Sequence, residues 1–250
     1  MTSADFRFHG ELNVFLPPKQ RAVIFSHFFK DRASIKDMIE SLGVPHPEVD
    51  AISVNKEWVD FSYIVGDKDI IDVYPVSVAK AFAQTVFVRP PILSVPTFVL
   101  DVHLGKLAAS LRMLGFDTLY RNDYDDQELA EISASQQRML LTRDKGLLMR
   151  SLVTYGYYVR ETNPERQVVE VLRRFDLSEK ALPFGRCIKC NGLLESVDKE
   201  SIFDQIPERT RTEIDEFHRC GECNQIYWQG SHAKRMQQFV EGVLDRKSEG

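Results

Sequence analysis

The four cysteines of this 250-residue chain stand in two Cys-x-x-Cys pairs, Cys187 with Cys190 and Cys220 with Cys223. Such a turn places two thiolates on one side of a tight loop, and two facing turns complete a tetrahedron of sulfur ligands. The spacing therefore predicts one Zn²⁺ site, with two disulfides or a redox pair as the alternative. Because four thiolates fill the coordination shell, we expect the zinc to be structural rather than catalytic.

Carboxylates recur where predicted strands end in the middle of the chain. Asp101 closes one apolar strand, Asp126 opens the helix after the next strand, and Asp144 lies two residues beyond a third. In open parallel sheets the functional crevice lies beyond the carboxyl ends of the strands, where neighbouring carboxylates can converge on cations. Mg²⁺ and Mn²⁺ prefer oxygen ligands, and paired ions of this kind support phosphodiester hydrolysis. The pattern therefore indicates a metal-dependent nuclease.

These acidic positions also have plain structural interpretations. Aspartates that follow strands commonly form turns and helix N-caps. Asp125 fits an N-cap, with Glu128 completing a capping box, and Asp123 fits a solvated loop. A carboxylate at Asp126 is also favoured by the dipole of the helix that it opens. Asp101 is harder to explain in this way because it ends a fully apolar run.

Basic and aromatic side chains near these sites are candidates for RNA contact. Arg143 and Lys145 flank Asp144 in a segment, 138–150, whose positive balance favours phosphate contact, with an ordinary solvated face as the alternative. Trp228 has the shape to stack on a base, with packing in a small ribbon core as the alternative. The other RNA-binding candidates after the second cysteine pair are His232, Lys234 and Arg235.

The elements that must position these residues follow from the apolar periodicity. Prolines at 90, 91 and 96 mark an extended linker, and the chain after it alternates strands with helices, which predicts a parallel sheet in an α/β domain. The expected strands are 98–100, 116–120, 139–142 and 155–160. The expected helices begin near residues 104, 126 and 164; Gly115 ends the first of them, and Asn163 with Pro164 caps the last.

The first 88 residues predict a small α+β domain of the β-grasp type. Alternating apolar residues on either side of Gly10 and again over 23–29 indicate strands, and Ser34 opens a helix that Gly43 ends. Strands are expected again over 51–55, 59–65 and 70–76. The stretch 66–75 resembles ubiquitin-like sulfur carriers, but no Gly-Gly tail follows, so we expect a docking or recognition module rather than carrier chemistry.

Bulk composition narrows the function further. The net charge of −5 argues against a broad nucleic-acid-binding surface, so an RNA-binding role must rest on local basic patches or bound cations. No apolar run reaches the length of a membrane span, and the N-terminus lacks the pattern of a signal peptide. Cysteines reserved for zinc fit a reducing compartment, so the cytoplasm is the expected location.

From residue 98 to 223 the chain resembles a PIN-like ribonuclease family named after the C-terminal domain of the nematode Mut-seven protein. The motifs that carry this resemblance are Asp101-Val-His-Leu-Gly-Lys-Leu-Ala108, Leu111-Arg-Met-Leu-Gly-Phe-Asp117, Asp126-Gln-Glu-Leu129, Leu140-Leu-Thr-Arg-Asp144, Cys187-x-x-Cys190-Asn191, Cys220-x-x-Cys223 and Trp228-x-Gly-Ser-His232. Members of this family pair an α/β nuclease core with a zinc ribbon, and many carry a ubiquitin-like N-terminal domain.

The resemblance implies RNA cleavage that depends on Mg²⁺ or Mn²⁺, with Asp101, Asp126 and Asp144 as the acidic centre. Lys106 and Thr142 are candidates for supporting it, and Asp125 is the nearest candidate for a fourth carboxylate. The expected domains are a β-grasp domain (1–88), a linker (89–96), a nuclease core (97–178) and a zinc ribbon with a final helix (179–250).

Two other functions compete with this one. In a non-catalytic adaptor, the ribbon and the ubiquitin-like module would bind RNA or protein, and the acids would be caps or remnants. In a sulfur-carrier-linked enzyme a carrier tail is expected, and the sequence lacks one. The RNA target, the mode of cleavage and the oligomeric state do not follow from the sequence.

Overall fold

The computed structural model describes residues 2–79, 81–82, 86–91, 95–228 and 238–244. It contains two compact units, each made of two stretches of chain. One comprises Met1–Leu93 and Asp126–Tyr158, and the other comprises Ser94–Asp125 and Val159–Gly250. Within the described ranges, no helix has the length and apolar character needed to cross a membrane.

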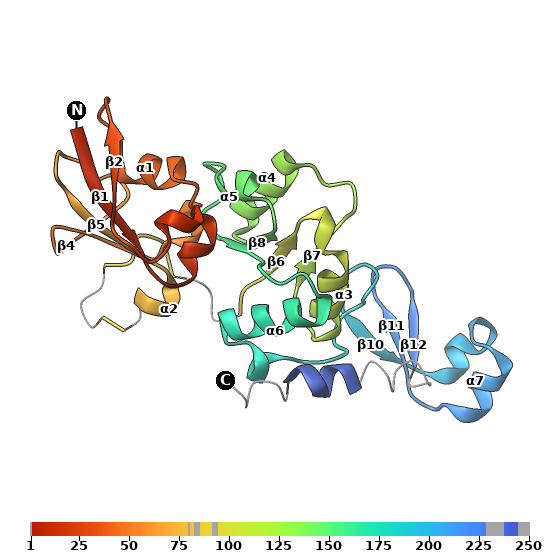
Figure 1. The fold of residues 1–250 in the computed structure, drawn as a ribbon. Helices are drawn as coiled ribbons and strands as arrows, with labels where there is room; N and C mark the ends of the chain where they lie inside the picture. Colours follow the sequence, from red (N-terminus) through yellow and green to blue (C-terminus); the bar gives the residue numbers. More distant parts are fainter. Residues whose placement is uncertain (1, 80, 83–85, 92–94, 229–237, 245–250) are drawn as a thin grey trace. The chain divides into compact units, whose positions relative to one another are not determined.

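A five-stranded mixed sheet forms the N-terminal part of the first unit, in the order β2-β1-β5-β3-β4 (Figure 1). Strand β1 runs antiparallel to β2 and parallel to β5, and β3 runs antiparallel to both β4 and β5. With one helix after the first hairpin, this is the predicted β-grasp arrangement. Its strands are β1 (Thr2–Phe8), β2 (Phe25–Phe29), β3 (Ala51–Val54), β4 (Glu57–Val59) and β5 (Ile70–Tyr74).

The helix of this module begins and ends where the sequence predicts. The Ser34 hydroxyl accepts a hydrogen bond from the Asp37 amide at 3.2 Å, and Gly43 takes a φ of +89° just after the end. The apolar face of the helix packs into a core that contains Phe6 and Phe8. The helical elements here are α1 (Ile35–Ser41), α2 (Val76–Ala79) and the 3₁₀ turns η1 (Gly10–Phe15), η2 (Pro18–Gln20) and η3 (His46–Glu48).

Two strand predictions for this module differ from the structure: the one after Gly10 is wrong, and the one over 59–65 is too long. The run after Gly10 is the turn η1, because Gly10 adopts a φ of +52° and the side-chain amide of Asn13 donates to the Phe8 and Gly10 carbonyls. The strand predicted over 59–65 ends at Val59. There the Asp60 carboxylate accepts hydrogen bonds from the backbone and hydroxyl of Ser62, which makes a turn.

The last residues of the predicted β-grasp domain, and Arg89 at the start of the predicted linker, pack beside β3. Arg89 forms an ion pair with the buried carboxylate of Asp50, and the Val88 amide donates to the Asp50 carbonyl at 2.8 Å. Phe87 forms an isolated β-bridge with Ala51. The proline run therefore follows a short segment that is attached to β3. The domain boundaries at 88, 96 and 178 stay predictions.

The second stretch of this unit contains two strands and two helices. Strands β8 and β9 pair in parallel, and every residue of β8 is buried, as expected for the interior of an α/β domain. Helices α4 and α5 both pack against β8. The elements are α4 (Asp126–Gln136), β8 (Met139–Thr142), α5 (Lys145–Leu148) and β9 (Gly156–Tyr158).

The other unit begins with the parallel strand pair β6 and β7 and two helices that pack together, α3 and α6. Phe98 contacts the rings of Phe116 and Phe175, with centroid distances of 6.4 and 5.8 Å. Asn163 caps α6 by accepting from two backbone amides, as predicted. The elements are β6 (Phe98–Leu100), η4 (Val102–Leu104), α3 (Gly105–Met113), β7 (Thr118–Leu119), α6 (Pro164–Phe175) and η5 (Ser178–Lys180).

A three-stranded antiparallel sheet, in the order β10-β11-β12, completes this unit and carries the cysteine pairs (Figure 1). Ile202, Ile206, Phe217 and Ile226 form its small core. This is the predicted ribbon. Its elements are β10 (Leu194–Val197), η6 (Lys199–Gln205), α7 (Glu208–Glu213), β11 (Phe217–Cys220) and β12 (Ile226–Trp228).

Candidate functional site

The four cysteine sulfurs lie together, all within 4.8 Å of one another. The Cys187 and Cys223 sulfurs are 3.6 Å apart, and those of Cys190 and Cys220 are 3.3 Å apart. In a tetrahedral site with Zn–S bonds of about 2.3 Å, sulfurs are separated by about 3.8 Å. The cluster therefore fits Zn²⁺ in its size and its soft ligands. All four thiols are free cysteines rather than disulfides, so the expected disulfide alternative is not observed.

The two cysteine turns have the same local construction. In each, the residue after the second cysteine is an asparagine with a left-handed backbone: Asn191 has a φ of +76° and Asn224 a φ of +58°. The Asn191 amide donates to the Cys187 carbonyl at 2.9 Å, and the Asn224 amide donates to the Cys220 carbonyl at 3.1 Å. Asparagine tolerates this conformation better than most residues do. Each turn therefore closes on itself and presents its two sulfurs together.

A tyrosine hydroxyl supports the cluster from β12. The Tyr227 hydroxyl lies 3.1 Å from the Cys187 sulfur. Burial raises the pKa of the Cys187 thiol, but hydrogen bonds from Tyr227 and the neighbouring cysteines outweigh it and lower that pKa to about 7. Burial and the same contact raise the pKa of Tyr227. The hydroxyl therefore stays protonated and donates to the thiolate that a zinc ligand must provide.

A buried arginine connects the first cysteine turn to the nuclease core. Arg112 on α3 is only 5% exposed, and its guanidinium donates to four backbone carbonyls. Two of these belong to the turn itself, Ile188 and Lys189, both at 3.0 Å. The other two belong to Thr118, the first residue of β7 (2.9 Å), and to Tyr120, which directly follows that strand (3.3 Å). With Zn²⁺ bound, four thiolates would leave the cluster with a net negative charge, which the guanidinium would offset.

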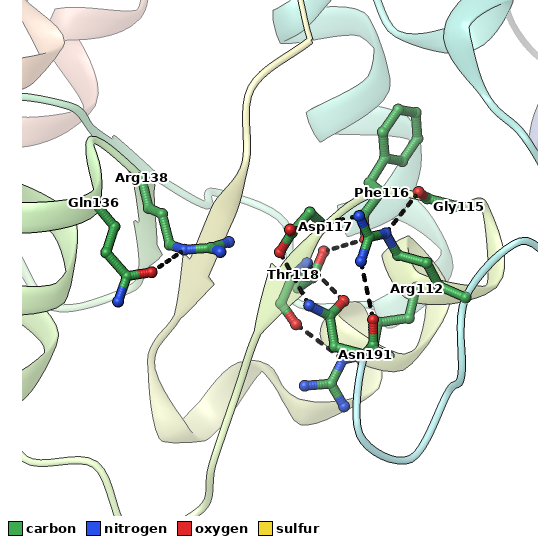
Figure 2. Close-up of polar contacts among 9 residues, drawn as sticks. Arg112, Gly115, Phe116, Asp117, Thr118, Gln136, Arg138 and Asn191 are labelled. Atoms are coloured by element: carbon green, nitrogen blue, oxygen red, sulfur yellow. Dashed lines mark hydrogen bonds and ion pairs between the residues drawn. The ribbon is translucent and has the colours of Figure 1, made fainter. Parts of the chain in front are cut away.

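Asparagine 191 makes a second connection between the turn and the core. Figure 2 shows Asn191 facing Asp117 and Thr118: its side-chain amide donates to the Asp117 carboxylate, and its oxygen accepts from the Thr118 amide, both at 2.9 Å. Arg186 donates to the Asn191 carbonyl at 3.0 Å and forms an ion pair with Asp117 at 3.4 Å. The ribbon is therefore joined to α3 and β7 by buried polar contacts rather than by a free linker.

Asp101 directly follows β6, as predicted, and is only 5% exposed. One of its oxygens accepts a hydrogen bond from the His103 amide at 2.9 Å and so caps the turn η4. Lys106, one turn further along in α3, is exposed. The capping interpretation and the metal interpretation are compatible at Asp101, because a carboxylate has acceptor sites beyond the one that the cap uses.

Asp144 lies two residues beyond β8 and caps α5. Its Oδ1 atom accepts from the amides of Gly146 at 2.7 Å and Leu147 at 3.4 Å. The Thr142 hydroxyl is fully buried and accepts from the Asp144 amide at 2.9 Å, which fixes the backbone where the side chain begins. Asp144 itself is exposed, and neither capping bond uses its Oδ2 atom. Thr142 therefore contacts the backbone of Asp144, and its role in supporting the centre stays a prediction.

Asp126 is the first residue of α4 and is half exposed. Arg150 approaches it at 3.9 Å and donates to the neighbouring Gln127 side chain at 2.9 Å. The adjacent Asp125 is also exposed. Asp123 forms a two-point surface ion pair with Arg121, at 2.9 and 2.6 Å, which agrees with a solvated loop. That contact lowers the pKa of Asp123.

Two protein-family models match the chain. The model described as the Mut7-C RNAse domain matches residues 96–240, and that described as Mut7-C ubiquitin matches residues 1–81. The first match spans more than half of the chain. The chain belongs to the Mut7-C RNase domain family. Comparison with curated proteins and with solved structures gives no match.

The two matches confirm the predicted Mut7-C architecture, with a ubiquitin-like domain before an RNase domain. Among the predicted RNA-binding residues of this Mut7-C chain, Arg143 and Lys145 stand on either side of Asp144. Trp228 packs against the ribbon core, with its ring 6.4 Å from that of Phe217, as in the structural interpretation. The remaining three candidates, His232, Lys234 and Arg235, lie outside the described residues.

Sequence reasoning missed the residues that attach the Mut7-C ribbon to the core. Arg112 and Asn191 both lie within the family motifs, but their partners are distant along the chain, and Arg112 sits on a mostly apolar helix. A clue was available in the Cys-x-x-Cys-Asn repeat, because asparagine is one of the few residues suited to end such a turn. For Tyr227, the sequence carries no comparable signal.

Proposed function

We propose that this chain is a metal-dependent ribonuclease in which Asp101, Asp126 and Asp144 serve one acidic centre. The match of an RNase family model to residues 96–240 carries the proposal. The positions of the acids support it: Asp101 and Asp144 each follow a strand that pairs in parallel with a neighbour, and Asp126 opens α4, which packs against β8. These are the places where open α/β folds put their functional groups.

The chemistry of these groups fits a hard divalent cation. All three are carboxylates, and oxygen is the donor that Mg²⁺ and Mn²⁺ prefer. Asp144 has an oxygen that its capping bonds leave available, and Asp126 is half exposed. When bound, such ions would supply Lewis acidity at the phosphodiester. The acidic net charge of the chain makes that positive charge useful toward a polyanionic substrate.

Neighbouring residues of the chain have supporting roles in this proposal. Thr142 holds the Asp144 backbone through its hydroxyl, and Lys106 reaches solvent one turn after Asp101. Arg143 and Lys145 would contact RNA phosphates, with an affinity that falls as salt is raised. The cysteine cluster holds a structural Zn²⁺, and the ubiquitin-like domain offers a surface for a protein partner.

The test is cleavage of an end-labelled pool of mixed RNA with Mn²⁺ present. Asp144→Asn removes the charge but keeps the cap, since asparagine caps helices as well as aspartate does. We expect the wild type to cleave and Asp144→Asn to lose at least about a hundredfold in rate, the scale seen when one charge-stabilising group is removed. The matched control is Asp123→Asn, which alters an exposed surface pair and should cleave like the wild type.

Two results would count against the proposal. Equal cleavage by the wild type and a folded Asp144→Asn protein would remove Asp144 from the reaction. Failure of the zinc-loaded wild type to cleave any RNA in the pool would favour the non-catalytic adaptor.

A further inference from the structure

The 3₁₀ turn η3 of the ubiquitin-like domain is buried against the strand β9 in the same compact unit. The Glu48 side chain accepts a hydrogen bond from the Tyr158 amide at 2.5 Å, and a His46 ring nitrogen lies 2.9 Å from the Val153 carbonyl oxygen. His46 and Glu48 are 7% and 2% exposed. Residues that are more than one hundred positions apart in the sequence thus meet in a desolvated contact.

Apolar contacts surround these polar ones. Tyr158 packs against the core of the ubiquitin-like domain, with its ring edge-on to Phe15 at a centroid distance of 5.3 Å. Gly156 allows the approach, because a Cβ there would lie 3.2 Å from the Pro47 side chain and 2.6 Å from that of Leu148. A glycine inside a strand commonly marks such an approach of another segment. The ubiquitin-like domain therefore packs directly against β9.

The burial of the Glu48 carboxylate requires a physical explanation. Burying a charge costs several kcal/mol unless hydrogen bonds compensate it, so a surface that merely packed two domains would favour apolar residues. The Glu48 carboxylate instead accepts from the backbone amide of Tyr158 in β9. It thereby occupies an amide that would otherwise be open to pairing with a further strand. The contact fixes how far β9 lies from η3 and also the register of β9 along η3.

Two contacts connect β9, which η3 holds in place, to Asp144. In the parallel pair β8 and β9, Tyr158 stands opposite Thr142. The Thr142 hydroxyl in turn accepts from the Asp144 amide at 2.9 Å. The first step is a strand pairing and the second a short hydrogen bond, and both pass through the fully buried Thr142, so a shift of β9 is transmitted to the residue that carries the carboxylate.

We propose that η3 of the ubiquitin-like domain is a brace for the end of β8, and that Glu48 is a positioning residue for Asp144. This inference rests on the proposed ribonuclease centre for its catalytic consequence, but the brace itself can be observed without activity. It gives the ubiquitin-like domain a role inside the nuclease in addition to any partner that it recruits.

The experiment compares Glu48→Leu, which removes the acceptor at similar size, with Glu48→Gln, which keeps an acceptor oxygen. The control is Glu57→Leu, an exposed glutamate of β4 in the same domain. Amide hydrogen exchange of the segment 139–148 reports the brace, and cleavage kinetics at varied RNA and Mn²⁺ report its effect on the centre. If Glu48→Leu does not fold, Glu48→Asp, which is one methylene shorter, takes its place.

We expect Glu48→Leu to speed exchange over 139–148 and to lower kcat about ten- to a hundredfold with KM within twofold, because a misplacement of about 1 Å costs that much. Glu48→Gln should restore most of both. Unchanged exchange in Glu48→Leu would overturn the brace whatever the activity. Faster exchange with an unchanged kcat would overturn the positioning role alone. If the wild type cleaves no RNA, the ribonuclease proposal fails, and the exchange comparison still decides the brace.

Discussion

Replacing Arg112 by methionine should loosen the attachment of the ribbon to the core. The guanidinium donates to four backbone carbonyls at 2.9–3.3 Å, and the substitution leaves all four without this donor. A hydrogen bond from a charged donor contributes roughly 1.5–3 kcal/mol, but the four bonds share one side chain and methionine keeps part of the packing. We therefore expect a loss of about 3–5 kcal/mol, the range for breaking a buried charged network.

The assay has two parts, because Arg112 touches both the core and the cysteine turn. A loss of that size should lower the melting temperature by about 10 °C in a chain of this length. Since two of the carbonyls are those of Ile188 and Lys189, zinc should also pass to a coloured chelator faster than from the wild type. Burial lowers the pKa of Arg112, but nearby Cys190 and Cys187 oppose that shift, so the group is charged at neutral pH.

Arg121→Met is the matched control. It removes the same charge from a nearby loop, where Arg121 forms an exposed ion pair with Asp123 that contributes at most about 1 kcal/mol. Arg112 does not hold the ribbon to the core if Arg112→Met melts and releases zinc like the wild type, or if Arg121→Met is equally destabilised.

Two further changes test the ribbon and its junction. Tyr227→Phe removes the hydroxyl that contacts the Cys187 sulfur, so chelator titration should show zinc held roughly ten- to a hundredfold more weakly; wild-type affinity would exclude this role. Gly115→Ala places a Cβ on the Leu182 carbonyl at a φ of +90°, so its melting temperature should fall well below that of Gly221→Ala, which has nothing within 4 Å; equal melting would contradict the geometry.

The sequence predicted correctly those helix ends that a single capping residue or glycine determines. Ser34 and Asn163 were recognisable as N-caps, and the glycines at 43 and 115 as helix ends, because each satisfies a backbone requirement within a few positions. In these cases the partners lie close together in the sequence. The Cys-x-x-Cys pairs predicted the sulfur cluster from their spacing, although the sulfurs in contact belong to residues 36 and 30 positions apart.

Contacts between distant segments were not predictable in this way. Nothing near Glu48 indicates that its carboxylate meets an amide 110 positions later, and Arg112 donates to a turn 76 and 77 positions away. The misread run after Gly10 is similar, because the Asn13 side chain, rather than apolar periodicity, decides the backbone there. The acids were predicted by position, and their common centre stays a proposal.

The central claim is that the three acids serve one metal-dependent centre, and a double-mutant comparison tests it directly. Single-turnover cleavage with Mn²⁺ would be measured for the wild type, Asp101→Asn, Asp144→Asn and the double variant. Residues that act as a unit have strongly non-additive effects. We predict that each single variant loses about a hundredfold or more and that the double variant is no slower than the slower single one. Losses that multiply, or wild-type cleavage by either folded single variant, would contradict the claim.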